Sequence, residues 1–175
     1  MGTFGNEAVG STYDYENADR KQGQMFTLTE NGSVTKLSVY VSNNAEFNQE
    51  CHVKGIIYSD NPAGTPDALK GTTPAITIAA GRAAGWLDCT FAAPVALTAG
   101  VYWIGIIWET DTTKLRWYRE LAGGTLAHNA NDYTAGPSDP FGAHTDSTSL
   151  FSIHADYDVP VPGFVGMTVT RLLQG

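Results

Sequence analysis

The sequence predicts an all-β protein, an antiparallel jelly-roll β-sandwich of about eight strands with a C-terminal extension. Apolar and polar residues alternate with a period of two along several short segments, as in strands with one buried face. Turn-forming pairs such as Asn31-Gly32 and Gly123-Gly124 separate these segments. No long stretch has the 3.6-residue period of an amphipathic helix, and no strand–helix alternation indicates a parallel sheet.

The clearest strands are predicted over residues 34–42, 51–58, 86–91, 101–108 and 149–157. In four of them every second residue is apolar, so that one face is expected to lie against a core. The residues expected on these faces are Leu37, Val39, Val41, Cys51, Val53, Ile57, Leu87, Cys89, Phe91, Phe151, Ile153, Ala155 and Tyr157. Weaker alternation predicts strands over residues 24–29, 75–79 and 114–119, whereas residues 67–70 are expected to make a helical turn at most.

Residues 101–108 are apolar on both faces, which is typical of a central strand covered on both sides. We expect Trp103 and Ile107 to belong to a strand buried between the two sheets. The other aromatic residues assigned to core packing are Trp86, Phe91, Phe151 and Tyr157. The segment has 8 residues, which is too short to span a membrane.

The two cysteines, Cys51 and Cys89, both fall on the apolar faces of their strands. Two cysteines cannot form a disulfide framework or a zinc site by themselves. We interpret them as buried thiols that act as small apolar side chains. A single buried disulfide between them is the alternative.

Two segments lie outside the strand pattern. Residues 121–148 are 28 residues rich in Gly, Asn, Asp, Ser and Thr, and connections of this length are usually functional or disordered. We expect this loop to lie on an outer face, to carry recognition, and to be shortened between residues 129 and 139 with little effect on folding.

The second segment is the C-terminal tail. A Pro160-Val161-Pro162 hinge precedes residues 164–173, where apolar residues alternate again. We therefore divide the chain into a domain over 1–158 and a C-terminal arm or assembly strand over 159–175, which either returns to its own sandwich or adds to a neighbouring sheet edge. The predicted assembly residues are Phe164, Val165, Met167, Val169, Leu172 and Leu173.

The formal net charge is −8 and no Lys/Arg run occurs, which argues against nucleic acid and anionic membranes as partners. The N-terminus has neither the basic region nor the apolar region of a secretory signal, so we expect no secretion. Charged residues make up only 16% of the chain, below the roughly 25% typical of soluble domains, so a neutral surface is expected.

The middle of the chain resembles a jelly-roll β-sandwich module of phage structural proteins and bacterial surface proteins. The resemblance rests on Ile57-Tyr58-Ser59-Asp60, then Gly64-Thr65-Pro66 with Leu69, followed by Trp86 and Phe91, and finally Leu97-Thr98-Ala99-Gly100-Val101-Tyr102-Trp103. It covers about residues 24–157. The module is mostly a binding or structural unit, and it carries no shared catalytic set, so the resemblance implies a fold and an assembly role but assigns no functional residue.

Catalytic and metal-binding patterns are weak. No Gly-x-Ser-x-Gly motif occurs, and the four histidines (His52, His128, His144 and His154) match no metal-ligand spacing. We interpret all four as surface residues and predict no enzymatic activity, no metal and no cofactor. A structural calcium site is the alternative, with two candidate groups: Asp14, Glu16 and Asp19, or Asp60, Asn61 and Asp67. Asx turns explain Asp60 and Asn61 equally well.

Aromatic side chains at strand ends and in the long loop could stack on sugar rings, because Tyr and Trp combine a large apolar ring with one polar group. The ligand-binding candidates are Trp108, Trp117, Tyr118, Tyr133 and Phe141. Packing under the loop, or a subunit interface, is the alternative for the same residues.

These observations predict a non-enzymatic virion structural protein, either a capsid decoration protein or a tail or fibre component, made in the host cytoplasm. Its expected partners are copies of itself, other virion proteins and host surface glycans. The alternative is a carbohydrate-binding module for cell-surface glycans. A depolymerase or other hydrolase is a distant third class.

Overall fold

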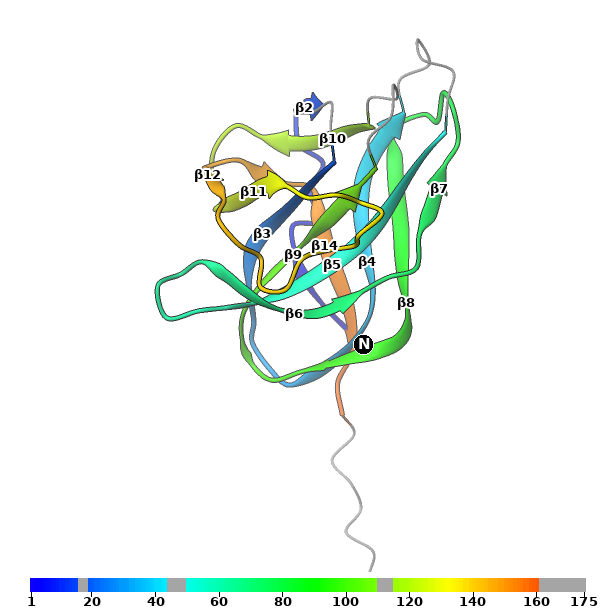
Figure 1. The fold of residues 1–175 in the computed structure, drawn as a ribbon. Coiled ribbons are helices and arrows are strands. Elements are labelled where there is room, and N and C mark those ends of the chain that lie inside the picture. The colour runs from blue at the N-terminus through cyan, green and yellow to red at the C-terminus, as the bar shows by residue number, and fades with distance from the viewer. Residues whose placement is uncertain (16–18, 44–49, 110–114, 161–175) are drawn as a thin grey trace, which may run out of the picture.

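The computed structural model describes residues 1–15, 19–43, 50–109 and 115–160, which form two antiparallel sheets packed face to face (Figure 1). The predicted all-β sandwich is therefore confirmed. The described residues contain fourteen strands rather than about eight. Five of these strands have only two to four residues, too few to produce a visible alternation in the sequence.

Sheet A has the strand order β1-β14-β4-β10-β13, with β2 paired to β10 and β8 paired to β4. Its strands are β1 (Gly2–Gly5), β2 (Thr12–Tyr15), β4 (Gly32–Asn43), β8 (Gly85–Leu97), β10 (Leu115–Glu120), β13 (Leu150–Phe151) and β14 (Ile153–Asp158). Sheet B has the order β12-β11-β3-β9-β5-β6, with β7 paired to β5. Its strands are β3 (Arg20–Leu28), β5 (Cys51–Asp60), β6 (Pro66–Thr72), β7 (Ile76–Ile78), β9 (Gly100–Trp108), β11 (Leu126–Ala130) and β12 (Thr145–Ser147).

The main core lies between the two sheets and contains the inward faces that alternation predicted. Leu37, Val39 and Val41 of β4 are fully buried, as are Ile153 and Ala155 of β14. Among the predicted inward residues, Leu87 is only partly buried. Residues 67–70 lie in strand β6 and not in a helical turn, because they pair with β5.

Both cysteines are buried in this core and form no disulfide, as the favoured interpretation predicted. Burial raises the pKa of the Cys89 thiol to about 12, so it stays protonated at neutral pH. The two thiols therefore act as small apolar side chains.

Strand β9 is buried on both faces, as predicted, but the placement of Trp103 and Ile107 between the sheets is wrong. Tyr102, Ile104 and Ile106 point into the main core, and the intervening residues point the opposite way. Trp103 and Ile107 instead belong to a second core on the outer face of sheet B. The members of this second core are Ile56, Tyr58, Trp103, Ile107, Ala127, Tyr133 and Phe141.

The long segment over residues 121–148 contains strands, contrary to the prediction from the sequence. It contains β11, which pairs with β3, and β12, which pairs with β11. The residues between these strands cross the outer face of sheet B (Figure 1). Phe141 is fully buried there and Tyr133 is 8% exposed, so this connection closes the second core and forms part of the fold.

A buried lysine also contacts the connection between β11 and β12. Lys21 of β3 is fully buried, and its Nζ lies 4.4 Å from the ring centre of Phe141 and donates a hydrogen bond to the hydroxyl of Ser138. The hydroxyl of Tyr58 donates to the carbonyl oxygen of Ser138 at 2.6 Å. Burial lowers the pKa of Lys21 to about 8, although the negative charge of Asp139 partly opposes this shift.

Candidate functional site

The outer face of sheet A carries a row of aromatic side chains that spans four strands. Tyr13 of β2 is paired with Tyr118 of β10, and Tyr40 of β4 is paired with Trp86 of β8. Ring contacts join the two pairs, because Tyr40 and Tyr118 lie 5.0 Å apart between ring centres. We call Tyr13, Tyr118, Tyr40 and Trp86 the aromatic row. Tyr13 is 46% exposed and the other three are partly exposed.

Tyr40 packs against Trp86 and Tyr118 with nearly perpendicular ring planes. The planes of Tyr40 and Trp86 meet at 82°, and those of Tyr40 and Tyr118 meet at 89°. Edge-to-face contacts of this kind are favourable because the positive ring edge meets the negative ring face. They therefore fix the orientations of Trp86 and Tyr118 on either side of Tyr40.

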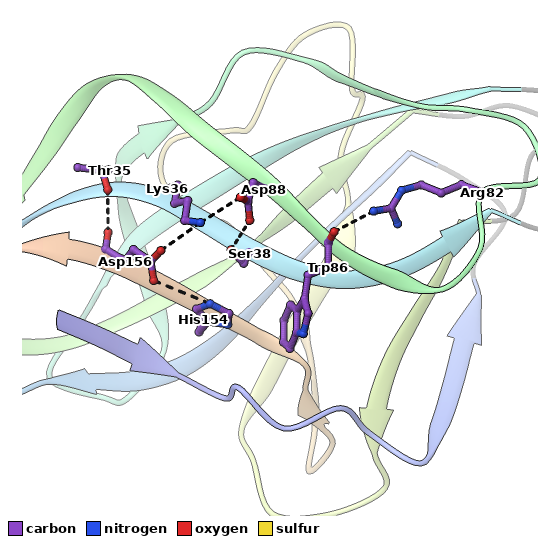
Figure 2. A network of polar contacts seen from close by, with 8 residues as sticks. All are labelled: Thr35, Lys36, Ser38, Arg82, Trp86, Asp88, His154 and Asp156. Atoms are coloured by element: carbon purple, nitrogen blue, oxygen red, sulfur yellow. Dashed lines mark hydrogen bonds and ion pairs between the residues drawn. The ribbon is translucent and has the colours of Figure 1, made fainter. Parts of the chain in front are cut away.

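The turn that precedes β8 positions Trp86. The guanidinium of Arg82 donates hydrogen bonds to the backbone carbonyls of Val41, Gly85 and Trp86 at 2.8–3.2 Å. Figure 2 shows Arg82 reaching the backbone of Trp86 while the indole ring points away toward His154. The two rings lie 4.8 Å apart between centres. The Trp86 backbone and ring are therefore held by separate contacts.

A group of polar side chains lies beside the aromatic row on β4, β8 and β14. The ammonium group of Lys36 bridges Asp88 at 3.0 Å and Asp156 at 3.2 Å, and Ser38 donates to Asp88 at 2.6 Å. His154 lies 3.9 Å from Asp156 (Figure 2). We call Lys36, Ser38, Asp88, His154 and Asp156 the polar cluster.

These contacts keep the two central charges of the polar cluster in place at neutral pH. The hydrogen bond to Asp88 raises the pKa of Lys36, and Asp156 adds to this effect against partial burial. Partial burial alone would raise the pKa of Asp88, but hydrogen bonds from Ser38 and Lys36 hold it below its ordinary value. The face therefore presents an ionised carboxylate next to an ammonium group.

The structure brings one of the five predicted ligand-binding residues to this face, and that residue is Tyr118. Trp108 and Trp117 are each 3% exposed in the main core, and Tyr133 and Phe141 are buried in the second core. These four side chains pack inside the protein, as the alternative interpretation held, and they offer no ring face to a ligand.

Trp86 was assigned to the core, and this assignment is wrong because its side chain is partly exposed on the outer face of sheet A. The alternation of β8 contained the signal, since Trp86 shares its phase with Asp88 and Thr90 rather than with Cys89. Tyr40 likewise shares its phase with Lys36 and Ser38. Tyr13 lies in a four-residue strand, which left no usable pattern.

Strand β8 also forms one edge of sheet A. Among the described strands only β4 pairs with it, and no charged residue occurs between Cys89 and Leu97. Ala92, Ala93 and Pro94 are exposed in this stretch. Edges without charges are open to pairing with another chain, but this edge is interrupted by a bulge, because residues 91–94, which include Pro94, stand opposite the single residue Thr35 of β4.

Pro160, the last described residue, lies near the C-terminal end of β8. Pro160 lines a surface depression together with residues 31–33 and 96–98, where β8 ends and β4 begins. The predicted assembly residues over 164–173 lie outside the described residues. In the sequence they follow Pro160 after three residues.

The histidines and four of the described calcium candidates have side-chain partners, including Asp19, which accepts the backbone N–H of Tyr133. The fifth candidate, Asp67, accepts the N–H of Phe141 through its backbone carbonyl. His52 lies 2.5 Å from Glu109, and His144 lies 3.4 Å from Asp146. The side chain of His128 hydrogen-bonds with that of Arg20. Among the calcium candidates, Asp14 forms an ion pair with Arg119, and Asp60 accepts a hydrogen bond from the indole N–H of Trp103. The side chain of Asn61 accepts hydrogen bonds from backbone N–H groups of its own turn. Glu16 lies outside the described residues. Within residues 1–15, 19–43, 50–109 and 115–160, no group of three His, Cys, Asp or Glu side chains could hold a metal.

Comparison with known proteins adds no family: neither a protein-family model nor a curated protein matches the sequence. In the part of the chain that the structure describes, no helix has the length and apolar character needed to cross a membrane.

Proposed function

We propose that this protein is a non-enzymatic structural component of a virion, in the capsid shell or the tail, which acts by binding copies of itself and other virion proteins. The observation that carries the proposal is the part of the β8 edge over residues 89–97, which has no charged residue and ends near Pro160, after which the sequence continues into the apolar C-terminal arm. The resemblance to a module of phage structural proteins supports the same function.

In the assembly we propose, the C-terminal arm of one copy adds a strand to the β8 edge of the next copy. Val165, Met167 and Val169 alternate with more polar residues, as a strand with one buried face requires. Burying an apolar side chain of this size contributes about 1.5–3 kcal/mol before entropy costs. Pro160 and Pro162 favour an extended chain that reaches away from its own domain.

Truncation after Asp158 tests this assembly. We expect the full chain to form oligomers in sedimentation velocity experiments, and the truncated chain to sediment as a folded monomer with an unchanged melting temperature. The reason is that β14, the last strand among the described residues, ends at Asp158, so the truncated chain retains every strand that the structure describes. Unchanged oligomerisation, or failure of the truncated chain to fold, would show that the arm is not an assembly strand.

A matched pair of lysine substitutions examines the edge itself. Ala93→Lys places a charge on the exposed edge of β8, whereas Thr27→Lys places one at an exposed position of β3 in the other sheet, where Thr27 pairs with Val101 of β9. We expect only Ala93→Lys to weaken oligomerisation, because charges on an edge strand oppose strand addition. Equal behaviour of the two variants would count against β8 as the docking edge.

A further inference from the structure

The outer face of sheet A combines partly exposed aromatic rings with hydrogen-bonding side chains, and the guanidinium of Arg116 lies over the ring of Tyr13, 4.7 Å from its centre. The aromatic row crosses β2, β10, β4 and β8, and the polar cluster lies beside it on β4, β8 and β14. We propose that this face binds a glycan, with pyranose rings lying against the aromatic row and sugar hydroxyls bonded by the polar cluster. This inference goes beyond the assembly function and does not depend on it.

The aromatic row is suited to a sugar because its rings are already oriented. A pyranose ring has an apolar face of C–H groups and a rim of hydroxyls, so it matches an aromatic ring that lies next to polar groups. Tyr40 fixes Trp86 and Tyr118 through nearly perpendicular contacts of 82° and 89°. Little side-chain entropy is then lost on binding, which favours affinity.

The polar cluster can both donate hydrogen bonds to sugar hydroxyls and accept hydrogen bonds from them. Lys36 has three N–H donors, and two of its neighbours are carboxylates that can only accept. Asp88 is 54% exposed at its side chain, so its oxygens stay open to hydroxyl donors even while Lys36 and Ser38 bind it. Donors and acceptors therefore occur side by side, as the hydroxyl rim of a sugar requires.

Other classes of ligand fit this face less well. Nucleic acid is disfavoured because the net charge of the chain is −8 and two carboxylates flank Lys36. The core of a protein–protein interface is typically depleted in Lys and Asp, whereas Lys36 and Asp88 lie next to the aromatic row. A neutral glycan can pack its apolar ring faces against the aromatic row and form hydrogen bonds with the charged groups of the polar cluster.

The test uses the full chain on a glycan array of neutral and amino-sugar pyranose oligosaccharides, followed by calorimetric titration with the strongest binder. We expect binding of at least one oligosaccharide. We expect Tyr118→Ala and Tyr13→Ala each to weaken it roughly tenfold, which corresponds to about 1.4 kcal/mol, because each substitution removes one aromatic contact with the sugar. Tyr13 is 46% exposed and lies outside both cores, so its replacement should leave the fold intact.

Asp88→Asn and Asp67→Asn form a matched pair on opposite sheets, because Asp67 is exposed on β6 of sheet B. Only Asp88→Asn should weaken glycan binding. The proposal is overturned if the array shows no bound oligosaccharide, or if the sheet A variants bind as tightly as the wild type. It is also overturned if these variants impair oligomerisation instead, because the face would then be a protein interface. None of these results depends on whether the truncated chain assembles.

Discussion

Replacement of Trp103 by alanine is expected to lower the free energy of unfolding by about 3–5 kcal/mol, as for other large deletions in cores. Trp103 is fully buried and is among the largest such side chains in the described residues. Its indole N–H also donates to a carboxylate oxygen of Asp60 at 2.8 Å. The substitution would therefore remove apolar contacts with the second core and leave Asp60 without this donor.

Urea unfolding monitored by circular dichroism measures this effect, and Trp86→Ala is the matched control. Trp86 lies on sheet A, is partly exposed, and belongs to neither core, whereas Trp103 is fully buried. We expect its replacement to cost clearly less than that of Trp103. Similar midpoints for the two variants, or a Trp103→Ala midpoint equal to that of the wild type, would contradict the second core.

Deletion of residues 129–139 is expected to destabilise the fold severely, by on the order of 3–5 kcal/mol or more. Loop-closure entropy changes little with loop length, so the loss comes from contacts. The deletion removes Tyr133 from the second core, together with Ser138, which binds Lys21 and Tyr58. The ammonium group of Lys21 would also lose the hydrogen bond that it donates to Ser138.

Thermal unfolding of the deleted chain is compared with that of Thr134→Ala, a substitution at an exposed position of the same connection. Thr134→Ala should change the melting temperature little, while the deleted chain should melt far lower or fail to fold. A deleted chain with nearly wild-type stability would restore the interpretation of this segment as a dispensable loop.

The sequence predicts the main core well because alternation reports one buried face of a strand directly. Val39 and Ile153 illustrate this, since each lies in phase with its apolar neighbours and is fully buried. The same pattern showed that the strand around Trp103 is covered on both sides. It could not show what covers the second side, because Tyr133 and Phe141 are isolated among polar residues and leave no periodicity.

The aromatic row could be predicted only in part. Alternation places Tyr40 and Trp86 on outward phases, but Trp86 was assigned to core packing together with other aromatic residues. The register that pairs Tyr13 with Tyr118 joins strands more than one hundred residues apart in the chain. Such long-range pairing depends on tertiary structure, and no local pattern in a single sequence encodes it.

The central claim, that this protein is a structural component of a virion, is tested most directly by quantitative mass spectrometry of purified virions. The virions come from an infected host in which this protein is synthesised. We predict that the protein co-purifies with intact particles through density-gradient centrifugation at a fixed copy number per particle. A copy number comparable to that of the major shell protein would place it in the capsid, and a small one would place it in the tail. Its absence from intact particles, with all of the protein recovered in the soluble fraction of the lysate, would contradict a structural role in the virion.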